Sequence, residues 1–137
     1  VAHDLAQKLM RVDKECHLYD DWHDQLLCAK NMHEGDIAIA FSYSGLTQEV
    51  LDCTAEAQRH SCPVVAVTKV DGSSKLATMA DAVLGVAASE PLVRSGAMAS
   101  RMAQLMVVDA LYAAYVASDY ERATHVIKQN YIEKQER

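Results

Sequence analysis

The chain has 137 residues, which is the size of one domain with a substantial hydrophobic core. Half of the residues are hydrophobic, yet no stretch approaches the roughly 18 uninterrupted apolar residues of a membrane span. The net charge of −6 disfavours nucleic-acid binding, because domains that bind DNA or RNA usually carry a basic face. We therefore expect one soluble domain that does not bind DNA by itself.

The start of the chain and its cysteines indicate the cellular setting. The chain begins at Val1 rather than Met and is already helical in pattern there, so we expect a piece of a longer protein, and no leader resembling a signal peptide is present. Four cysteines form no C-x-x-C pair: Cys16, Cys28, Cys53 and Cys62. Most lie among apolar neighbours, which favours free thiols in a reducing cytoplasm and disfavours a structural metal site.

The first third of the chain predicts two helices and two strands. Apolar residues recur at helical spacing from Asp4 to Val12, and a second helix is expected from Asp20 to about Met32. Between them, Cys16-His17-Leu18-Tyr19 is a candidate for a short strand. Ile37 to Phe41 is a nearly unbroken apolar run, which is typical of a strand buried on both faces.

The apolar run ends abruptly in hydroxyl side chains. Ser42, Ser44 and Thr47 surround Gly45, and a helix is expected from Gln48 to His60. A strand that continues through such a turn into a helix gathers N–H groups, the positive end of the helix dipole and hydroxyls at one point, which suits a phosphate. The alternative is that Thr47 only caps the helix and Ser44-Gly45 only forms a tight turn.

The middle of the chain continues the alternation of strand and helix. Strands are expected at Pro63 to Thr68 and Ala82 to Val86, with a short helix from Lys75 to Ala80 between them. This alternation predicts an α/β fold with a parallel sheet and helices on both faces. Ligands of such sheets bind beyond the carboxyl ends of the strands, where the hydroxyl turn is expected.

The segment Ala87 to Gly96 has no clear period and follows the third strand, so we expect a loop that reaches over the same crevice. The next helix, Ala97 to Ser118, is apolar on more than one face, which predicts packing against a second subunit. The alternative is a helix buried within one monomer. Ser118 to Glu121 would cap a last helix that ends near Arg137.

Two motifs indicate a family. The first is Ser42-Tyr43-Ser44-Gly45-Leu46-Thr47, and the second is Arg94-Ser95-Gly96-Ala97-Met98-Ala99-Ser100-Arg101. Through them the sequence resembles the sugar isomerase (SIS) domain, and more closely the SIS domain of bacterial RpiR-type transcription regulators. The S-x-S-G-x-T turn is shared across SIS proteins and implies phosphosugar binding, whereas the second motif is similar to the regulator branch. The resemblance implies a three-layer αβα, flavodoxin-like parallel sheet.

The resemblance also implies roles for the residues of the turn. In SIS domains the hydroxyls that match Ser42, Ser44 and Thr47 hold the sugar phosphate, and the backbone at Gly45 lets the phosphate approach closely.

Three further residues would contact the sugar. His23 belongs to a D-x-H run similar to that of many regulators and would bond a sugar hydroxyl or the phosphate; otherwise it is a surface residue at a helix start. Glu90 and Arg94 match a charged pair of the regulator loop and would bond sugar hydroxyls or cross to the other subunit. Their alternative is an exposed ion pair worth about 0–1 kcal/mol.

One departure from the family concerns the beginning of the domain. SIS domains normally start with a strand and a Gly-x-Gly/Ala-x-Ser loop, and neither precedes Val1 here. We therefore expect residues 1–137 to form an SIS domain that lacks its first strand. The helix-turn-helix DNA-binding domain of the regulators is also absent.

The function that follows is an effector-sensing domain in the bacterial cytoplasm. It would bind a phosphorylated sugar and, as a homodimer or higher oligomer through the helix Ala97 to Ser118, signal to a DNA-binding domain outside this chain. No catalytic residue, metal or cofactor is expected. The alternative is a phosphosugar isomerase or etherase, with Glu90 and His23 as the acid-base groups. A nucleotide- or flavin-binding module is disfavoured because the chain has no G-x-G-x-x-G run.

Overall fold

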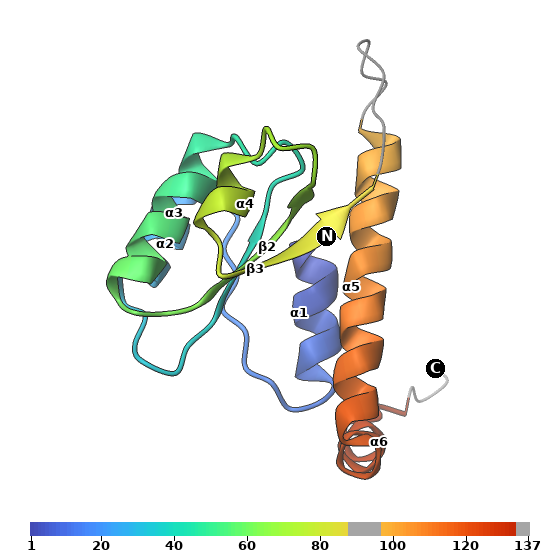
Figure 1. The fold of residues 1–137 in the computed structure, drawn as a ribbon. Coiled ribbons are helices and arrows are strands. Elements are labelled where there is room, and N and C mark those ends of the chain that lie inside the picture. Colours follow the sequence, from blue (N-terminus) through green and yellow to red (C-terminus); the bar gives the residue numbers. More distant parts are fainter. Residues whose placement is uncertain (88–96, 134–137) are drawn as a thin grey trace.

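The computed structural model of the chain describes residues 1–87 and 97–133 (Figure 1). It has the expected three-layer α/β fold, in which a parallel sheet lies between two groups of helices. Three strands follow one another across the sheet in the order β1-β2-β3: β1 (Ala38–Phe41), β2 (Val64–Lys69) and β3 (Ala82–Val86). Because all of them are parallel, their carboxyl ends lie at one edge of the sheet.

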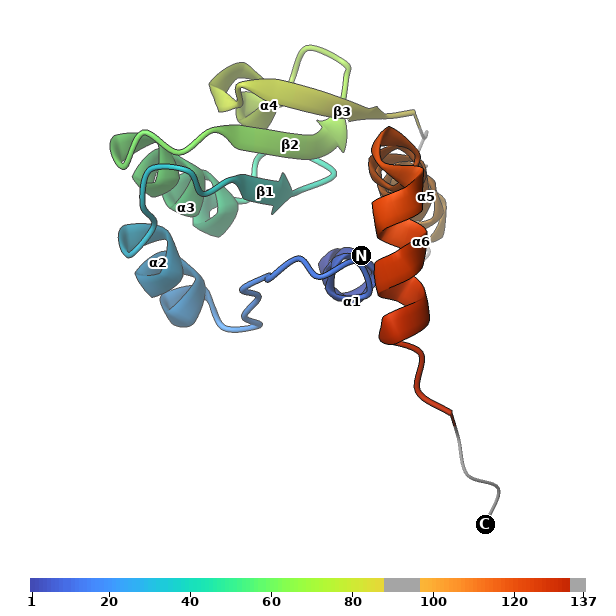
Figure 2. The ribbon, with the colours of Figure 1, turned by 90° about the horizontal axis from the view of Figure 1, so that it is seen from below.

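Three of the described helices lie on each side of the sheet. On one face lie α2 (Trp22–Lys30), α3 (Gln48–Arg59) and α4 (Lys75–Met79). Here α3 and α4 pack on β1 and β2, and α2 packs on α3. On the other face lie α1 (Ala2–Met10), α5 (Met98–Ser118) and α6 (Tyr120–Gln129). Here α5 packs on β2 and β3, and Figure 2 shows α1 and α6 beside α5.

The hydrophobic core is centred on β2, the middle strand. Val64, Ala66 and Val67 are fully buried there, because helices cover both faces of this strand. Leu76 of α4 and Val108 of α5 are buried against opposite faces of the same sheet. Each such aliphatic side chain contributes about 1.5–3 kcal/mol relative to an exposed one. The β-branched run that predicted this strand is therefore the centre of the domain.

The edge position of β1 limits its burial. All four of its residues are only half-buried, although the apolar run predicted a strand buried on both faces. The physical reason is that β1 pairs with β2 on one side, and no other described strand lies on its outer side.

Two predictions are wrong: one predicted strand is not a strand, and the last helix is shorter than expected. The segment Cys16-His17-Leu18-Tyr19 is not a strand, because no described strand lies alongside it to complete a ladder. The last helix, α6, is capped by Asp119 as expected, with Asp119 Oδ1 accepting from Arg122 N at 3.3 Å. It ends at Gln129 rather than near Arg137, because Asn130, a residue of low helix propensity, ends the turn.

Candidate functional site

The hydroxyl turn, residues 42–47, links β1 to α3 at the carboxyl edge of the sheet. Ser42 N donates to Val67 O at 3.2 Å, and Lys69 N donates to Tyr43 O at 3.1 Å. These two bonds extend the pairing of β1 with β2 beyond Phe41. The turn is therefore anchored to the middle strand before it leaves the sheet.

The side chains of the turn form a hydrogen-bonded group. Ser42 Oγ lies 2.9 Å from Thr47 Oγ1 and accepts from Gly45 N at 3.1 Å. Ser44 Oγ accepts from Leu46 N at 3.3 Å. Ser42 is buried, Ser44 is half-buried and Thr47 is exposed, so the group extends from the core to the surface. The structure thus brings Ser42, Gly45 and Thr47 into direct contact, with Ser44 in the same turn.

The first turn of α3 leaves donors available next to these hydroxyls. Thr47 occupies the N-cap position, but its side chain makes no capping hydrogen bond. The N–H groups of Gln48 and Glu49 donate to no other residue that the structure describes, whereas Val50 N and Leu51 N donate to Thr47 O. The capping alternative therefore does not account for the Thr47 hydroxyl. Free amides, the positive end of a 12-residue helix and two hydroxyls meet at this point.

Gly45 is required by packing within the protein. Its φ is +65°, and a Cβ placed on it would lie 1.8 Å from Ser74 Oγ and 2.9 Å from Thr68 Oγ1. Thr68 Oγ1 and Ser74 Oγ are 3.0 Å apart, and Leu76 N donates to Gly45 O at 3.0 Å. The resemblance attributed Gly45 to the approach of a phosphate, but the close neighbours here are the end of β2 and the start of α4.

The supporting residues Thr68 and Ser74 were missed by the sequence analysis. Both are buried, and Ser74 also caps α4 by accepting from Ala77 N at 3.1 Å. Their role depends on contacts across more than 20 residues of sequence, which only the pairing of β1 with β2 brings about. The available signal was the hydroxyl run that follows β2, which resembles the one that follows β1.

Comparison with known proteins places this fold and turn in a family. A family model described as the SIS domain matches residues 1–114. The chain belongs to the SIS domain family. Relatives of this SIS domain include uncharacterised HTH-type transcriptional regulators of Caldanaerobacter subterraneus, 40% identical over 120 residues, and Bacillus subtilis, 35% identical over 128 residues. These matches cover 88% and 93% of this chain but only 42% and 45% of the relatives, so the chain spans less than half of their length.

Solved structures agree with the fold. The Vibrio vulnificus NanR protein complexed with ManNAc-6P matches with a TM-score of 0.84 and 29% identity, over 93% of this chain and 47% of that one. The sugar isomerase domain of the RpiR transcription factor from Sphaerobacter thermophilus matches with a TM-score of 0.79 and 23% identity, over 93% and 69% of the two chains. The second likeness shows the fold alone. The predicted SIS-type fold is therefore confirmed.

The charged pair at the same edge of the SIS domain is internally satisfied. Lys69 Nζ lies 2.7 Å from Asp71 Oδ2, and Ser73 Oγ donates to Asp71 Oδ1 at 2.6 Å. The Lys69 ammonium and the Ser73 hydroxyl hold the pKa of the Asp71 carboxyl well below its usual range. Because Lys69 is paired with Asp71, hydroxyls and amides are the donors that the turn offers to an anion.

His23 is the second residue of α2, the helix that packs on α3. The end of α2 is at the opposite edge, because Met32 packs beside Val64 and Cys62 Sγ donates to His33 O at 3.1 Å. The nine residues of α2 span about 13 Å, so His23 lies about that far from this end of the helix. His23 is exposed, and within the described chain its side chain forms no hydrogen bond to the turn.

The other two predicted sugar contacts, Glu90 and Arg94, lie outside the described residues. Within residues 1–87 and 97–133, no group of three or more His, Cys, Asp or Glu side chains is placed to hold a metal ion. None of the helices in these ranges combines the length and the apolar character needed to cross a membrane.

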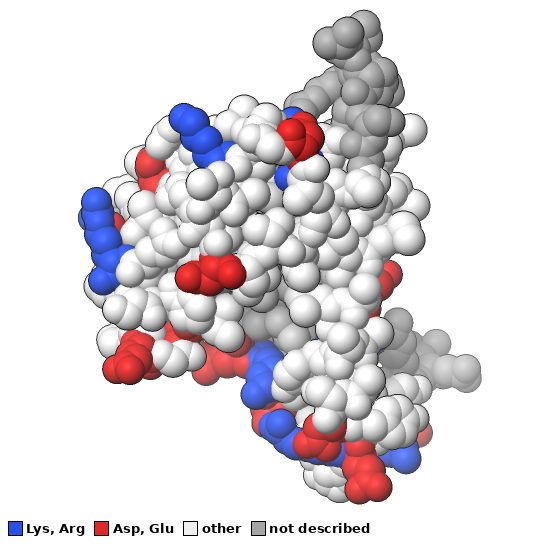
Figure 3. Space-filling model, in the orientation of Figure 1, with Lys and Arg blue, Asp and Glu red and all other residues white. Residues whose placement is uncertain are grey.

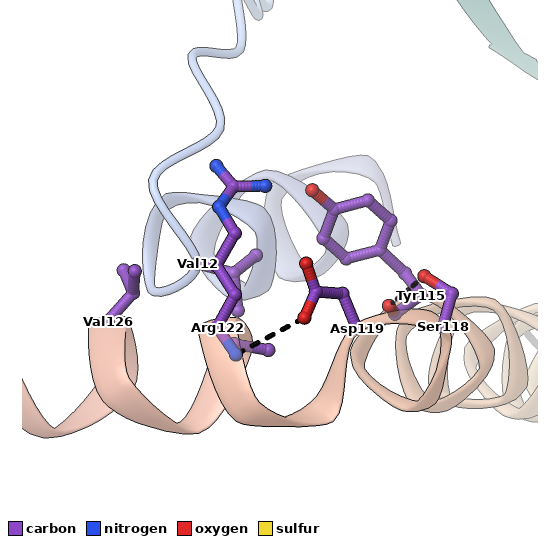
Figure 4. Close-up of a pocket in the computed structure, with 7 residues that line it drawn as sticks. Val12, Tyr115, Ser118, Asp119, Arg122 and Val126 are labelled. Carbon is purple, nitrogen blue, oxygen red and sulfur yellow. Dashed lines mark hydrogen bonds between the residues drawn. The ribbon is translucent and has the colours of Figure 1, made fainter.

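A shallow hollow of about 160 Å³ lies away from the turn, near the carboxyl end of α5 (Figure 4). The 21 residues of α5 span about 30 Å, which separates this hollow from the carboxyl edge of the sheet. Tyr115, Asp119 and Arg122 line it together with the apolar side chains of Val12 and Val126. Asp119 and Arg122 give this lining no excess of positive charge, so we do not identify the hollow with the anion site.

Proposed function

We propose that this SIS domain binds a phosphorylated sugar at the hydroxyl turn and is the effector-sensing domain of an RpiR-type bacterial transcription regulator. The observation that carries the proposal is the contact between Ser42 and Thr47 beside the free N–H groups of Gln48 and Glu49. Phosphoryl oxygens accept several such hydrogen bonds at once. The regulator names of the relatives and the ManNAc-6P complex of NanR support the ligand class.

In this proposal two groups of residues contact different parts of the ligand. Ser42, Ser44, Gly45 and Thr47 contact the phosphate. The sugar would be contacted by His23, Glu90 and Arg94. Hydroxyls that contact only the phosphate give affinity without choosing the sugar, so the identity of the sugar depends on the second group.

Signal transmission would use parts outside this chain. Only an effector that binds two conformations with different affinity shifts their equilibrium. We propose that a cytoplasmic homodimer, formed through α5, passes this shift to a DNA-binding domain that precedes or follows residues 1–137. Relatives more than twice as long as the match support a further domain. Figure 3 shows Lys and Arg scattered among Asp and Glu on one face, without a broad basic area for DNA.

Isothermal titration with a panel of hexose and amino-sugar phosphates tests the proposal. We expect one phosphorylated sugar to bind and the same sugar without its phosphate to bind far more weakly. Ser42→Ala and Thr47→Ala should each weaken binding about tenfold, because each removes a donor to a charged group. Ser118→Ala is the matched control, since Ser118 is an exposed serine at the far end of α5. Absence of binding at millimolar concentrations would overturn the proposal.

The second candidate is a phosphosugar isomerase or etherase of the same fold. A putative sugar-phosphate isomerase from Listeria monocytogenes shares the fold, with a TM-score of 0.75 and 21% identity, over 91% of this chain and 68% of that one. Such an enzyme needs an acid-base pair, for which the sequence offers Glu90 and His23. Incubation with sugar phosphates in deuterated water separates the two functions. An isomerase exchanges a carbon-bound proton, and a sensor does not.

A further inference from the structure

The hollow near the carboxyl end of α5 lies where three helices meet. Its apolar lining comes from the end of α1 and from α6: Val12 and Ala123 are buried, and Val126 is half-buried. Its polar lining comes from the corner at which α5 turns into α6, and Figure 4 shows three of these side chains: Tyr115, Asp119 and Arg122. An apolar surface beside a few converging polar groups is the usual make-up of a small-molecule site.

Contacts within the domain fix the walls of this hollow. Asp119 is the only residue between α5 and α6, and its non-helical backbone (φ −147°, ψ 75°) forms the corner. Asn130 Nδ2 donates to Arg11 O at 3.3 Å, which ties the end of α6 to the end of α1. Lys14 Nζ lies 5.9 Å from the centroid of the Tyr115 ring, at the distance of a cation–π contact. The hollow is therefore formed before any ligand binds.

Three polar groups of the hollow are available to a ligand. Ser118 Oγ donates to Tyr115 O at 2.7 Å, so that hydroxyl is already used. Asp119 Oδ1 accepts from Arg122 N at 3.3 Å, which leaves Oδ2. Within residues 1–87 and 97–133, Asp119 Oδ2, the Tyr115 hydroxyl and the Arg122 guanidinium have no hydrogen-bond or ion-pair partner. Figure 4 shows all three groups on the same side of the corner.

The size and the charges of the hollow narrow the class of ligand. Its volume of about 160 Å³ is roughly that of five water molecules in the liquid, whereas sites for drug-sized ligands measure about 300–1,000 Å³. A nucleotide or a bulky cofactor is therefore too large. Because Arg122 and Asp119 carry opposite charges and form no ion pair, a ligand with one charge would satisfy only one of them. A small ligand with both charges and an apolar group matches the whole lining.

We propose that this hollow binds a free α-amino acid with a compact aliphatic side chain. The carboxylate of the amino acid accepts hydrogen bonds from the Arg122 guanidinium and the Tyr115 hydroxyl. Its ammonium group donates to Asp119 Oδ2, and its side chain packs on Val12 and Val126. The planar guanidinium of arginine presents paired N–H groups that match a carboxylate, and both bonds to charged groups are stronger than neutral ones.

The bound amino acid connects α1 with α6 across the corner. Arg122 belongs to α6 and Asp119 is its cap, whereas Val12 follows α1. Because Asp119 is the only residue between α5 and α6, this connection fixes the direction of α6. The site goes beyond the proposed function, because the 21 residues of α5, about 30 Å, separate it from the carboxyl edge of the sheet. It gives the domain a second ligand that does not use the hydroxyl turn.

NMR titration of the chain with L-leucine tests the ligand class. We expect saturable shifts with a dissociation constant of about 1 mM, because a ligand of few atoms in an open hollow binds weakly. 4-Methylpentanoate lacks the ammonium group and 3-methylbutylamine lacks the carboxylate. Each of these analogues should bind at least about tenfold more weakly than leucine, since each loses one charged hydrogen bond. No saturable shift, or equal binding of either analogue, would overturn the proposal.

Substitutions of the charged residues test the assigned contacts. Arg122→Gln and Asp119→Asn should each weaken leucine binding at least about tenfold. Asparagine preserves the cap of α6, because its amide oxygen accepts the same backbone hydrogen bond. Lys128→Gln and Glu121→Gln are the matched controls, since both are exposed charged residues of α6 that do not line the hollow. Equal effects of the controls and the two test variants would contradict the assigned contacts.

The positions of the shifted signals distinguish this site from the hydroxyl turn. Leucine should move the amide signals of Val12 and of residues 115–126 and leave those of Gly45 to Glu49 unchanged. Tyr115→Phe keeps the ring beside Lys14 and removes only the hydroxyl, so it should weaken leucine binding about threefold without moving the site. Leucine-dependent shifts confined to the hydroxyl turn would overturn the proposal.

Discussion

At the scale of residues, Gly45 connects the hydroxyl turn to the rest of the domain. Its conformation needs a positive φ, and its missing side chain makes room for Ser74 and Thr68. The three residues come from the ends of β1 and β2 and the start of α4. The shape of the turn is therefore set by packing within the protein, before any ligand arrives.

Gly45→Ala should lower the free energy of unfolding by about 2–4 kcal/mol, because a Cβ would overlap Ser74 Oγ and strain the left-handed backbone. Urea unfolding measures this. Gly72→Ala is the control, since Gly72 also has a positive φ of +78° but has nothing within 4 Å of the added Cβ. It should cost only about 1 kcal/mol. Equal effects of the two substitutions would show that packing against Ser74 is unimportant.

A substitution at Thr54 should change the free energy of unfolding in the opposite direction. It is 2% exposed on α3, and its hydroxyl oxygen lacks a hydrogen-bond partner in the described structure. Thr54→Val keeps the shape and removes the unpaired hydroxyl, so it should raise the free energy of unfolding by up to about 1 kcal/mol. Thr68→Val is the counterpart and should destabilise, because Thr68 Oγ1 bonds Ser74 Oγ and Tyr43 O. Destabilisation by Thr54→Val would contradict this explanation.

Part of the candidate site could be predicted from the sequence because its residues are close together in the chain. Ser42, Ser44 and Thr47 lie within one short turn, so a local pattern was sufficient to find them. Thr68 and Ser74 reach the same turn only through the pairing of two strands, and no local pattern reveals that contact. Whether His23 reaches the ligand likewise depends on how α2 packs, which no local pattern reveals.

At the scale of elements, helices and strands with a clear apolar period were predicted well. The run that became β2 is buried along most of its length and pairs on both sides, so local pattern and tertiary context agree there. The pattern failed for residues 16–19 and for the burial of β1 and β3. Both depend on whether another strand lies alongside, which is a property of the neighbour and not of the segment.

Hydrogen exchange tests this interpretation of residues 16–19. Their backbone N–H groups donate to none of the residues that the structure places, whereas β2 is paired on both sides. We expect the amides of Cys16 to Tyr19 to exchange rapidly and those of Val65 to Val67 to be the slowest in the domain. Mass spectrometry or NMR gives both rates in one experiment. Strong protection of residues 16–19 would show that they pair with a strand after all.

At the scale of the whole molecule, α5 lies between the proposed ligand site and the proposed dimer interface. One side of this helix packs on β2 and β3, whose carboxyl ends lie at the proposed ligand site, and the other side exposes Met98, Met102 and Met106. A change at the carboxyl edge of the sheet therefore has a rigid path to the proposed dimer interface. The same helix explains why a sequence apolar on several faces predicted a partner.

The central claim is that the hydroxyl turn is an anion receptor, and backbone NMR during a sugar-phosphate titration tests it most directly. We predict that the amide signals of Gly45 to Glu49 shift in a saturable way, that the unphosphorylated sugar leaves them unchanged, and that Ser42→Ala weakens the effect. If these amides do not respond while other parts of the domain bind the sugar phosphate, the turn is not the receptor.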